Sequence, residues 1–142
     1  KNEINEFHKL KELVNNSLSF QKNTTNVTTS AEEALKKGSG VCQDFTNIFI
    51  ACCRLYGHPA RYVSGYLILK NQKVQEAMHA WAEVFVEGLG WVGFDTTNNI
   101  SPDDRYVRVA IGRDYTDAAP IRGVTTGVQD ESLSISITVA EQ

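Results

Sequence analysis

Residues 38–45 read Gly-Ser-Gly-Val-Cys-Gln-Asp-Phe, and we take this stretch to decide how the rest of the chain is arranged. Its two glycines form a turn that runs directly into a helical pattern of apolar residues, and Cys42 stands where that helix should begin. The first N–H groups of a helix have no internal partner, and the helix dipole adds partial positive charge there, so both favour a thiolate. The position fits a nucleophile, but a small buried core cysteine is an equally good interpretation at this point.

The composition is that of an ordinary globular protein. The 142 residues are 42% hydrophobic and 22% charged, which predicts a single domain over residues 1–142 with a core of its own. A net charge of −3 disfavours a nucleic-acid partner. No apolar run approaches the roughly 20 residues that span a bilayer, so no membrane partner is expected. The chain starts with Lys1 and shows no signal peptide, so we expect a fragment that an upstream segment can precede.

The three cysteines, Cys42, Cys52 and Cys53, form neither a disulfide framework nor a metal-ligand spacing. This usage indicates a reducing compartment, and we therefore expect a cytoplasmic protein without a metal or cofactor. Cys52 and Cys53 fall on the apolar stripe of the helix predicted to start at Cys42, so we expect both of them in the core.

Three helices are predicted before the first strand. Apolar residues spaced by three and four predict an amphipathic helix over residues 1–18, which a polar connector over 21–29 follows. Ser30 and Glu33 form a capping box that begins a short helix ending in the glycine turn. The third helix covers residues 42–56.

The second half of the chain has the pattern of strands. Aromatic and β-branched residues predict strands over residues 60–69, 79–87 and 91–95, and strict alternation predicts a final strand over 132–139. Residues 96–131 are rich in Gly, Asp and Thr, and we expect them to be mostly loop despite some short apolar pieces. Helices followed by an antiparallel meander predict an α+β fold.

A nucleophilic thiol needs a base, and the base works better when a third group orients it. His79 opens the second predicted strand and Asp95 closes the third, so a hairpin between them would place both residues at one end of the sheet. If His79 faces the helix, alternation puts Trp81 and Glu83 on the same face, subject to any bulge. A helix start packed on that end would complete a triad with Cys42. Taken singly, His79 fits a strand-edge histidine and Asp95 a residue that shapes a turn.

Four blocks carry a resemblance to a known family. They are the stretch 38–45, Gly-His-Pro-Ala-Arg-Tyr-Val-Ser-Gly-Tyr at 57–66, His-Ala-Trp-Ala-Glu-Val at 79–84, and Gly-Trp-Val-Gly-Phe-Asp-Thr-Thr-Asn at 90–98. In this order they resemble the transglutaminase-like superfamily, and most of all its bacterial members that are labelled cysteine proteases. The resemblance covers roughly residues 25–140.

This resemblance implies both a fold and a site. The fold is a papain-like α+β core in which N-terminal helices, with the nucleophile helix among them, pack on an antiparallel sheet. The site has Cys42 as nucleophile, His79 as general base and acid, and Asp95 as the orienting carboxylate. Some bacterial relatives carry an additional N-terminal β-rich domain, which would explain the abrupt start of this chain.

One part of the family pattern is missing. Acyl transfer develops an oxyanion, which a donor besides the Cys42 N–H should stabilise. Bacterial relatives tend to show Phe-x-Tyr upstream of the cysteine, whereas this chain has Phe20-Gln21-Lys22. The second donor is therefore unassigned, and its candidates are Gln21, Lys22 and Asn23.

We expect a cysteine peptidase or amidase that hydrolyses amide bonds of a protein or peptide substrate through an acyl-enzyme. The alternative is amine acyl transfer, as in a crosslinking transglutaminase. The bacterial resemblance favours hydrolysis, and Asp103-Asp104 alone is too little for an acidic calcium-binding loop. A non-catalytic protein-binding module would typically have lost a triad residue. A zinc site built from Cys42, His79 and Asp95 would have only three ligands.

Overall fold

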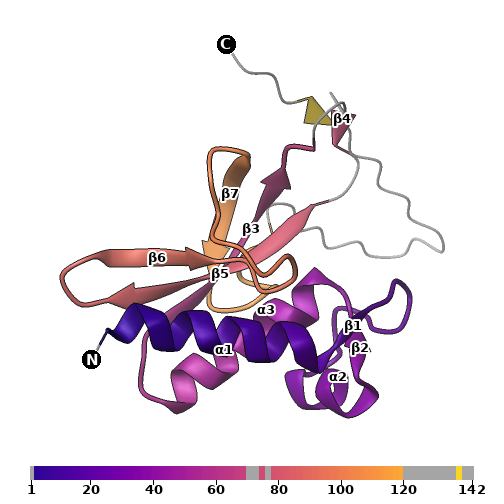
Figure 1. The fold of residues 1–142 in the computed structure, drawn as a ribbon. Coiled ribbons are helices and arrows are strands. Elements are labelled where there is room, and N and C mark those ends of the chain that lie inside the picture. The colour runs from indigo at the N-terminus through magenta and orange to yellow at the C-terminus, as the bar shows by residue number, and fades with distance from the viewer. Residues whose placement is uncertain (1, 70–73, 76–77, 120–136, 139–142) are drawn as a thin grey trace.

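The computed structural model describes residues 2–69, 74–75, 78–119 and 137–138. Three helices gather on one side of the molecule and a four-stranded sheet lies on the other (Figure 1). The helices are α1 (Glu3–Ser17), α2 (Ala31–Lys37) and α3 (Cys42–Leu55). All three helices expected from the sequence are therefore confirmed, with bounds that differ by one or two residues.

Local chemistry explains where the short helix α2 starts and stops. The Ser30 hydroxyl accepts from the N–H of Glu33, and the Glu33 carboxylate accepts from the N–H of Ser30, which is the predicted capping box. Gly38 ends the helix in the left-handed region, with φ of 67°, where a residue without Cβ is favoured. The predicted glycine turn thus leads from α2 toward α3.

The main sheet is entirely antiparallel, and its strands lie in the order β6-β5-β3-β7. Its members are β3 (Ala60–Leu67), β5 (His79–Val86), β6 (Gly90–Phe94) and β7 (Tyr106–Gly112). Two short pairs flank it: β1 (Ser19–Phe20) runs parallel to β2 (Ser39–Gly40), and β4 (Val74–Gln75) runs antiparallel to β8 (Ile137–Thr138).

Helix α3 lies at the centre of the core. It contacts the other two helices as well as β3 and β5. Its buried side chains include Phe45 and Phe49, and the strand beneath contributes small residues such as Ala80 and Ala82. Small residues on β5 let the helix approach the sheet closely, so the start of α3 is held at a defined place relative to the strand ends.

The structure corrects the sequence analysis in two places. First, the segment expected to be mostly loop contains β7, which pairs with β3 and forms one edge of the sheet. Second, the face of β5 that meets α3 carries its alanines and Val84, whereas Glu83 bonds to Arg61 and Arg108 instead. Of the predicted last strand, Ile137–Thr138 is β8 and the remainder lies outside the described residues.

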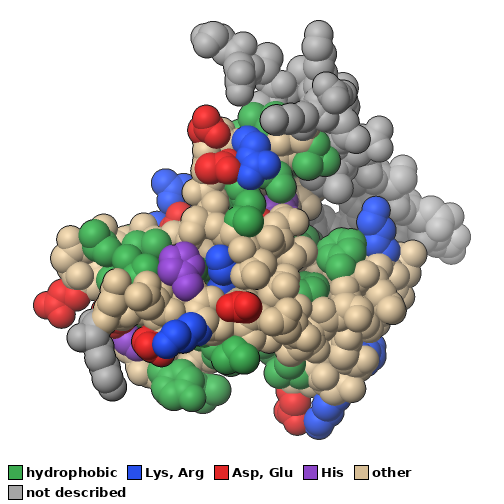
Figure 2. All heavy atoms as spheres, viewed as in Figure 1, with side chains coloured by type: hydrophobic (Ala, Val, Ile, Leu, Met, Phe, Trp, Pro, Cys, Tyr) green, Lys and Arg blue, Asp and Glu red, His purple; other side chains and the backbone are tan. Residues whose placement is uncertain are grey.

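Charges of both signs are interspersed with apolar side chains on the face shown in Figure 2. Among the helices in the described part of the chain, none combines the length and the apolar character that a bilayer crossing requires.

Candidate active site

Cys42 is the first residue of α3 and is half-buried. The helix start is fixed by Asp44, whose Oδ2 accepts from the Val41 N–H at 2.8 Å and from the Thr25 hydroxyl at 2.6 Å. The Thr46 hydroxyl donates to the Cys42 carbonyl at 2.8 Å. Hydrogen bonds on both sides of Cys42 therefore fix the backbone that carries the sulfur.

Gly40 has to be a glycine because of this arrangement. A Cβ at this position would lie 2.6 Å from Asp44 Oδ2, which is closer than real contacts allow. The absence of a side chain lets the turn pass directly over the carboxylate that caps α3.

His79 and Asp95 meet at the end of the sheet, as the predicted hairpin requires. His79 is the first residue of β5, and Asp95 directly follows β6. The His79 Nε2 and Asp95 Oδ2 atoms are 2.7 Å apart. The Asp95 side chain is fully buried and that of His79 is 14% exposed, so little solvent screens this contact.

Asp95 accepts hydrogen bonds from two further residues. The Asn98 N–H donates to Oδ1 at 3.2 Å, and the Asn98 side chain donates to Oδ2 at 2.8 Å. The Tyr106 hydroxyl donates to the same Oδ2 at 2.6 Å. Three residues thus fix the orientation of one carboxylate.

The sequence alone predicts no role for Asn98 or Tyr106. For Asn98 a signal existed, because an asparagine three residues after an aspartate in a turn is well placed to return a hydrogen bond. For Tyr106 there was none, since it lies on the strand β7 that the sequence did not predict.

The surroundings of His79 favour its charged form. Burial acts against the charge and is the largest single influence, but hydrogen bonds to Asp95 and Cys42, with the attraction of both groups, together raise the pKa of His79 to about 9. Burial likewise acts against the charge of Asp95, yet its bonds to His79, Tyr106 and Asn98 lower the pKa of this carboxyl. The pair is therefore an imidazolium and a carboxylate at neutral pH.

Cys42 lies near the His79 ring, since a hydrogen bond to its side chain is among the influences that raise the pKa of the histidine. Since Nε2 faces Asp95, the ring nitrogen left for the sulfur is Nδ1. All three residues predicted for the site are thus brought together, with the histidine in the middle. A proton can pass between Nδ1 and a group bound at the sulfur while Nε2 stays held by the aspartate.

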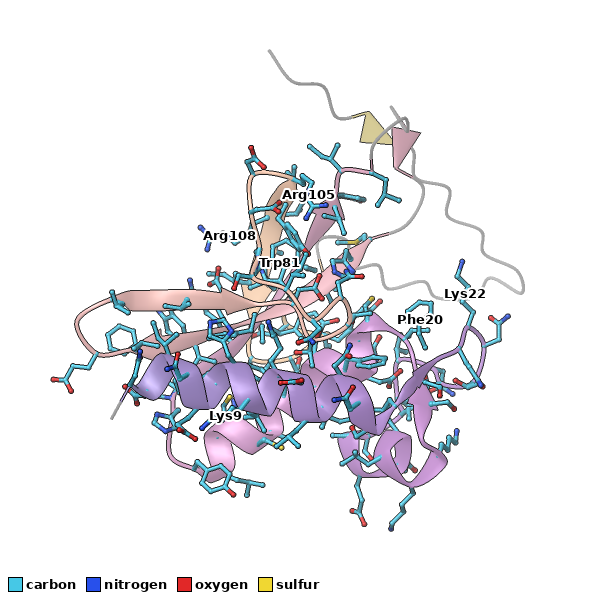
Figure 3. All side chains as sticks on the ribbon, viewed as in Figure 1. Lys9, Phe20, Lys22, Trp81, Arg105 and Arg108 are labelled. Carbon is cyan, nitrogen blue, oxygen red and sulfur yellow. The ribbon has the colours of Figure 1, made fainter. Side chains whose placement is uncertain are left out.

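Of the three candidates for a second oxyanion donor, Gln21 contacts the turn before Cys42. Strand β1 runs beside β2 with Phe20 opposite Gly40, and the Gln21 N–H donates to the Gly40 carbonyl at 2.9 Å. Figure 3 shows Phe20 beside the start of α3 and Lys22 extending outward. The choice between Gln21, Lys22 and Asn23 stays a prediction.

Within the described ranges, no group of three His, Cys, Asp or Glu side chains is arranged to hold a metal ion. What the site does offer is a cysteine sulfur, a histidine whose charged form is favoured and a fixed carboxylate. That set of groups fits acyl transfer at a carbonyl carbon.

Fold and site together define a papain-like α+β protein with a cysteine at a helix start beside a histidine–aspartate pair. The family model of the Transglutaminase-like superfamily matches residues 1–96, and the chain belongs to this superfamily.

Individual relatives are consistent with this family assignment. The chain is 36% identical over 127 residues to an uncharacterized protein of Mycobacterium leprae, which covers 86% of this chain and 45% of that protein. A solved structure from Cytophaga hutchinsonii, described as a "Putative Cysteine Protease", superposes with a TM-score of 0.73 at 33% identity, over 84% of this chain and 39% of the other. LapG of Legionella pneumophila shares the fold with a TM-score of 0.62 at 15% identity, over 77% of this chain and 64% of LapG. The chain spans less than half the length of the curated relatives it matches at 36–37% identity.

Proposed function

We propose that this protein is a thiol hydrolase that cleaves amide or peptide bonds through an acyl-enzyme on Cys42. The single observation that carries the proposal is that His79 Nε2 lies 2.7 Å from Asp95 Oδ2 while Cys42 lies near enough to the same ring to help raise the pKa of the histidine. The superfamily and the description of the Cytophaga hutchinsonii protein support the same chemistry.

In the first half of the proposed reaction, the Cys42 sulfur attacks the carbonyl carbon of the substrate and forms a tetrahedral oxyanion. The Cys42 N–H at the start of α3 stabilises this oxyanion, since that backbone donor has no partner within the helix. The C–N bond then breaks, and the imidazolium of His79 gives its Nδ1 proton to the departing amine. A thioester remains on the cysteine.

The second half returns the enzyme to its starting state. Neutral His79 takes a proton from a water molecule, whose oxygen attacks the thioester carbon. The C–S bond breaks, the carboxylic acid product leaves, and the thiolate faces an imidazolium again. Asp95 keeps its hydrogen bond to Nε2 throughout, so the ring does not rotate between the two steps.

Amine acyl transfer is the alternative for the second half. A lysine amine would replace water at the thioester and leave an isopeptide bond. The first half and the three residues are the same in both reactions, so only the acceptor distinguishes them.

The test is incubation of the protein with a peptide library and a primary amine, followed by mass spectrometry. Cleavage, side-chain deamidation and amine incorporation change the mass differently, so one experiment separates them. We expect cleaved peptides from the wild type and none from Cys42→Ser. Amine incorporation without cleavage would replace hydrolysis by the alternative, and no product from any peptide would favour a non-catalytic binding module.

A further inference from the structure

Helix α1 carries a buried lysine on the side that meets the loop after β6. Lys11 is 7% exposed, and its Nζ donates to the Asn99 carbonyl at 3.0 Å. An ammonium is costly to bury unless it has a partner, so a lysine at such a place marks a specific contact. Burial lowers the pKa of Lys11, and the nearby Asp95 opposes this effect.

One helical turn further along, Asn15 contacts the same loop. Its side-chain amide donates to the Thr96 carbonyl at 2.9 Å and to the Thr97 carbonyl at 3.0 Å. Residues four apart lie on one face of a helix, so a single face of α1 supplies the donors for three carbonyls of this loop. Each of these carbonyls would otherwise need a different partner.

These carbonyls belong to the Asp95 loop, by which we mean residues 95–100. Its two ends are tied together, because the N–H of Asp95 donates to the Ile100 carbonyl at 3.0 Å and the reverse bond measures 3.2 Å. Asn99 has a φ of 56°, in the left-handed region, which asparagine adopts more often than most residues other than glycine. The bond from Lys11 falls on the carbonyl of this residue.

We propose that Lys11 and Asn15 are positioning residues, which hold the Asp95 loop where its carboxylate meets the histidine. The inference rests on the proposed function, because it makes α1 part of the apparatus for acyl transfer. The loop bears both Asp95 and Asn98, whose bonds to each other and to His79 depend on where its backbone lies.

The charged and titratable groups around the contact between His79 and Asp95 come from four elements. His79 on β5 and Tyr106 on β7 bond to Asp95, Cys42 on α3 reaches the histidine ring, and Lys11 on α1 lies close enough to attract the carboxylate. Moving the loop weakens the Asp95 bond and leaves burial to act against the charge of His79. The proton of His79 therefore reports the position of the loop.

The test compares Lys11→Met and Asn15→Leu with two matched variants on the exposed side of the same helix, Lys9→Met and Asn16→Leu. Figure 3 shows Lys9 extending from α1 away from the sheet. For each protein we would measure the midpoint of thermal unfolding, the titration of His79 by NMR, and kcat and KM on a cleaved peptide. Rates are expressed per folded molecule.

For Lys11→Met and Asn15→Leu we expect the pKa of His79 to fall from about 9 toward its ordinary value of 6.5. We expect kcat to fall about 10- to 100-fold with little change in KM, as for a small displacement of a catalytic group. The exposed variants should match the wild type. A His79 titration and a rate per folded molecule equal to those of the exposed variants would overturn the proposal, even if the unfolding midpoint dropped.

The proposed hydrolase function and the positioning role of Lys11 and Asn15 can be contradicted independently of each other. If the wild type hydrolyses no peptide but His79 still shifts in the two variants, the positioning role stands and the proposed function is wrong. If the wild type hydrolyses peptides and neither variant moves the titration or the rate, the function stands and the positioning role is wrong.

Discussion

His79 is the residue at which the electrostatics of the site converge. Its pKa of about 9 lies above the ordinary value of 6.5, so the folded protein binds the proton more tightly than the unfolded chain does. The proton therefore stabilises the fold fully below about pH 6.5, and this contribution is lost as the pH rises from there to about 9. The opposite holds for Asp95, whose lowered pKa gives stability that is lost as the pH falls.

A first prediction concerns His79→Gln, which keeps a donor near Asp95 but cannot titrate. Between about pH 6 and pH 9, the free energy of unfolding of the wild type should fall by roughly 1–3 kcal/mol more than that of the variant, since each pKa unit is worth about 1.4 kcal/mol. Denaturant unfolding at the two pH values measures this difference. Equal losses in the two proteins would show that the histidine is not held as a cation.

A second prediction concerns Tyr106→Phe, which removes the donor 2.6 Å from Asp95 Oδ2. A hydrogen bond to a charged group contributes about 1.5–3 kcal/mol, so we expect a stability loss in this range at neutral pH. With one donor fewer, the pKa of Asp95 should rise, and acid unfolding should begin at a higher pH than in the wild type. Tyr56→Phe is the control, because Tyr56 is 80% exposed. Identical acid-unfolding curves for the two variants would contradict the role given to Tyr106.

At the scale of elements, the decisive contact is the one between β3 and β7. Their register shifts between Ser64 and Gly65, and a Cβ at Gly65 would collide with the Val107 carbonyl and lie 2.9 Å from the Trp81 ring. Glycine therefore lets β7 approach β3 closely. The strand begins at Tyr106, next to this point, so the same approach brings the tyrosine to Asp95.

A third prediction follows for Gly65→Ala. The clash with backbone should cost more than about 3 kcal/mol of unfolding free energy, because β7 cannot keep its register. Gly88→Ala is the comparison: nothing lies near its Cβ, and its φ of 81° alone should cost about 1–2 kcal/mol. Chemical denaturation of both variants measures the two costs. Equal losses would mean that the close approach of β7 contributes nothing.

Elements with strong local signals were predictable from the sequence, and β7 was not. The capping box of α2 and the glycine turn before Cys42 are set by neighbouring residues. Strand β7 lies at the sheet edge, its side chains are partly or fully exposed, and its partners on β3 lie 39 to 50 positions away in the sequence. Periodicity carries little information for such a strand. The role of Tyr106 was not predictable because the residue lies on β7. The hairpin of β5 and β6, in contrast, was enough to place His79 beside Asp95.

The question of which face of β5 packs against α3 shows a second limit of prediction from the sequence. Alternation correctly separates its two faces, but which face meets α3 depends on the packing of the whole core. The alanines lie under the helix, and Glu83 lies on the other face with Arg61 and Arg108. His79 still reaches Cys42 because it stands at the strand end rather than under the helix.

At the scale of the whole molecule, the site exists only when distant parts of the chain come together. Cys42 begins a helix, His79 and Tyr106 each begin a strand, and Asp95 directly follows another strand. The reactivity that we propose for Cys42 would therefore be a property of the fold and not of the local sequence. The chain contains its own comparison in two further cysteines: burial raises the pKa of the half-buried Cys52, and it raises that of the buried Cys53 to about 12.

The most direct test of the account is the alkylation rate of each cysteine by iodoacetamide at about pH 6, measured by mass spectrometry of the digested protein. We predict that Cys42 reacts at least about 10-fold faster than Cys52 or Cys53, that His79→Ala removes the difference, and that unfolding in denaturant removes it as well. If Cys42 in the folded wild type reacts no faster than the other two cysteines, it is not the nucleophile and the account is contradicted.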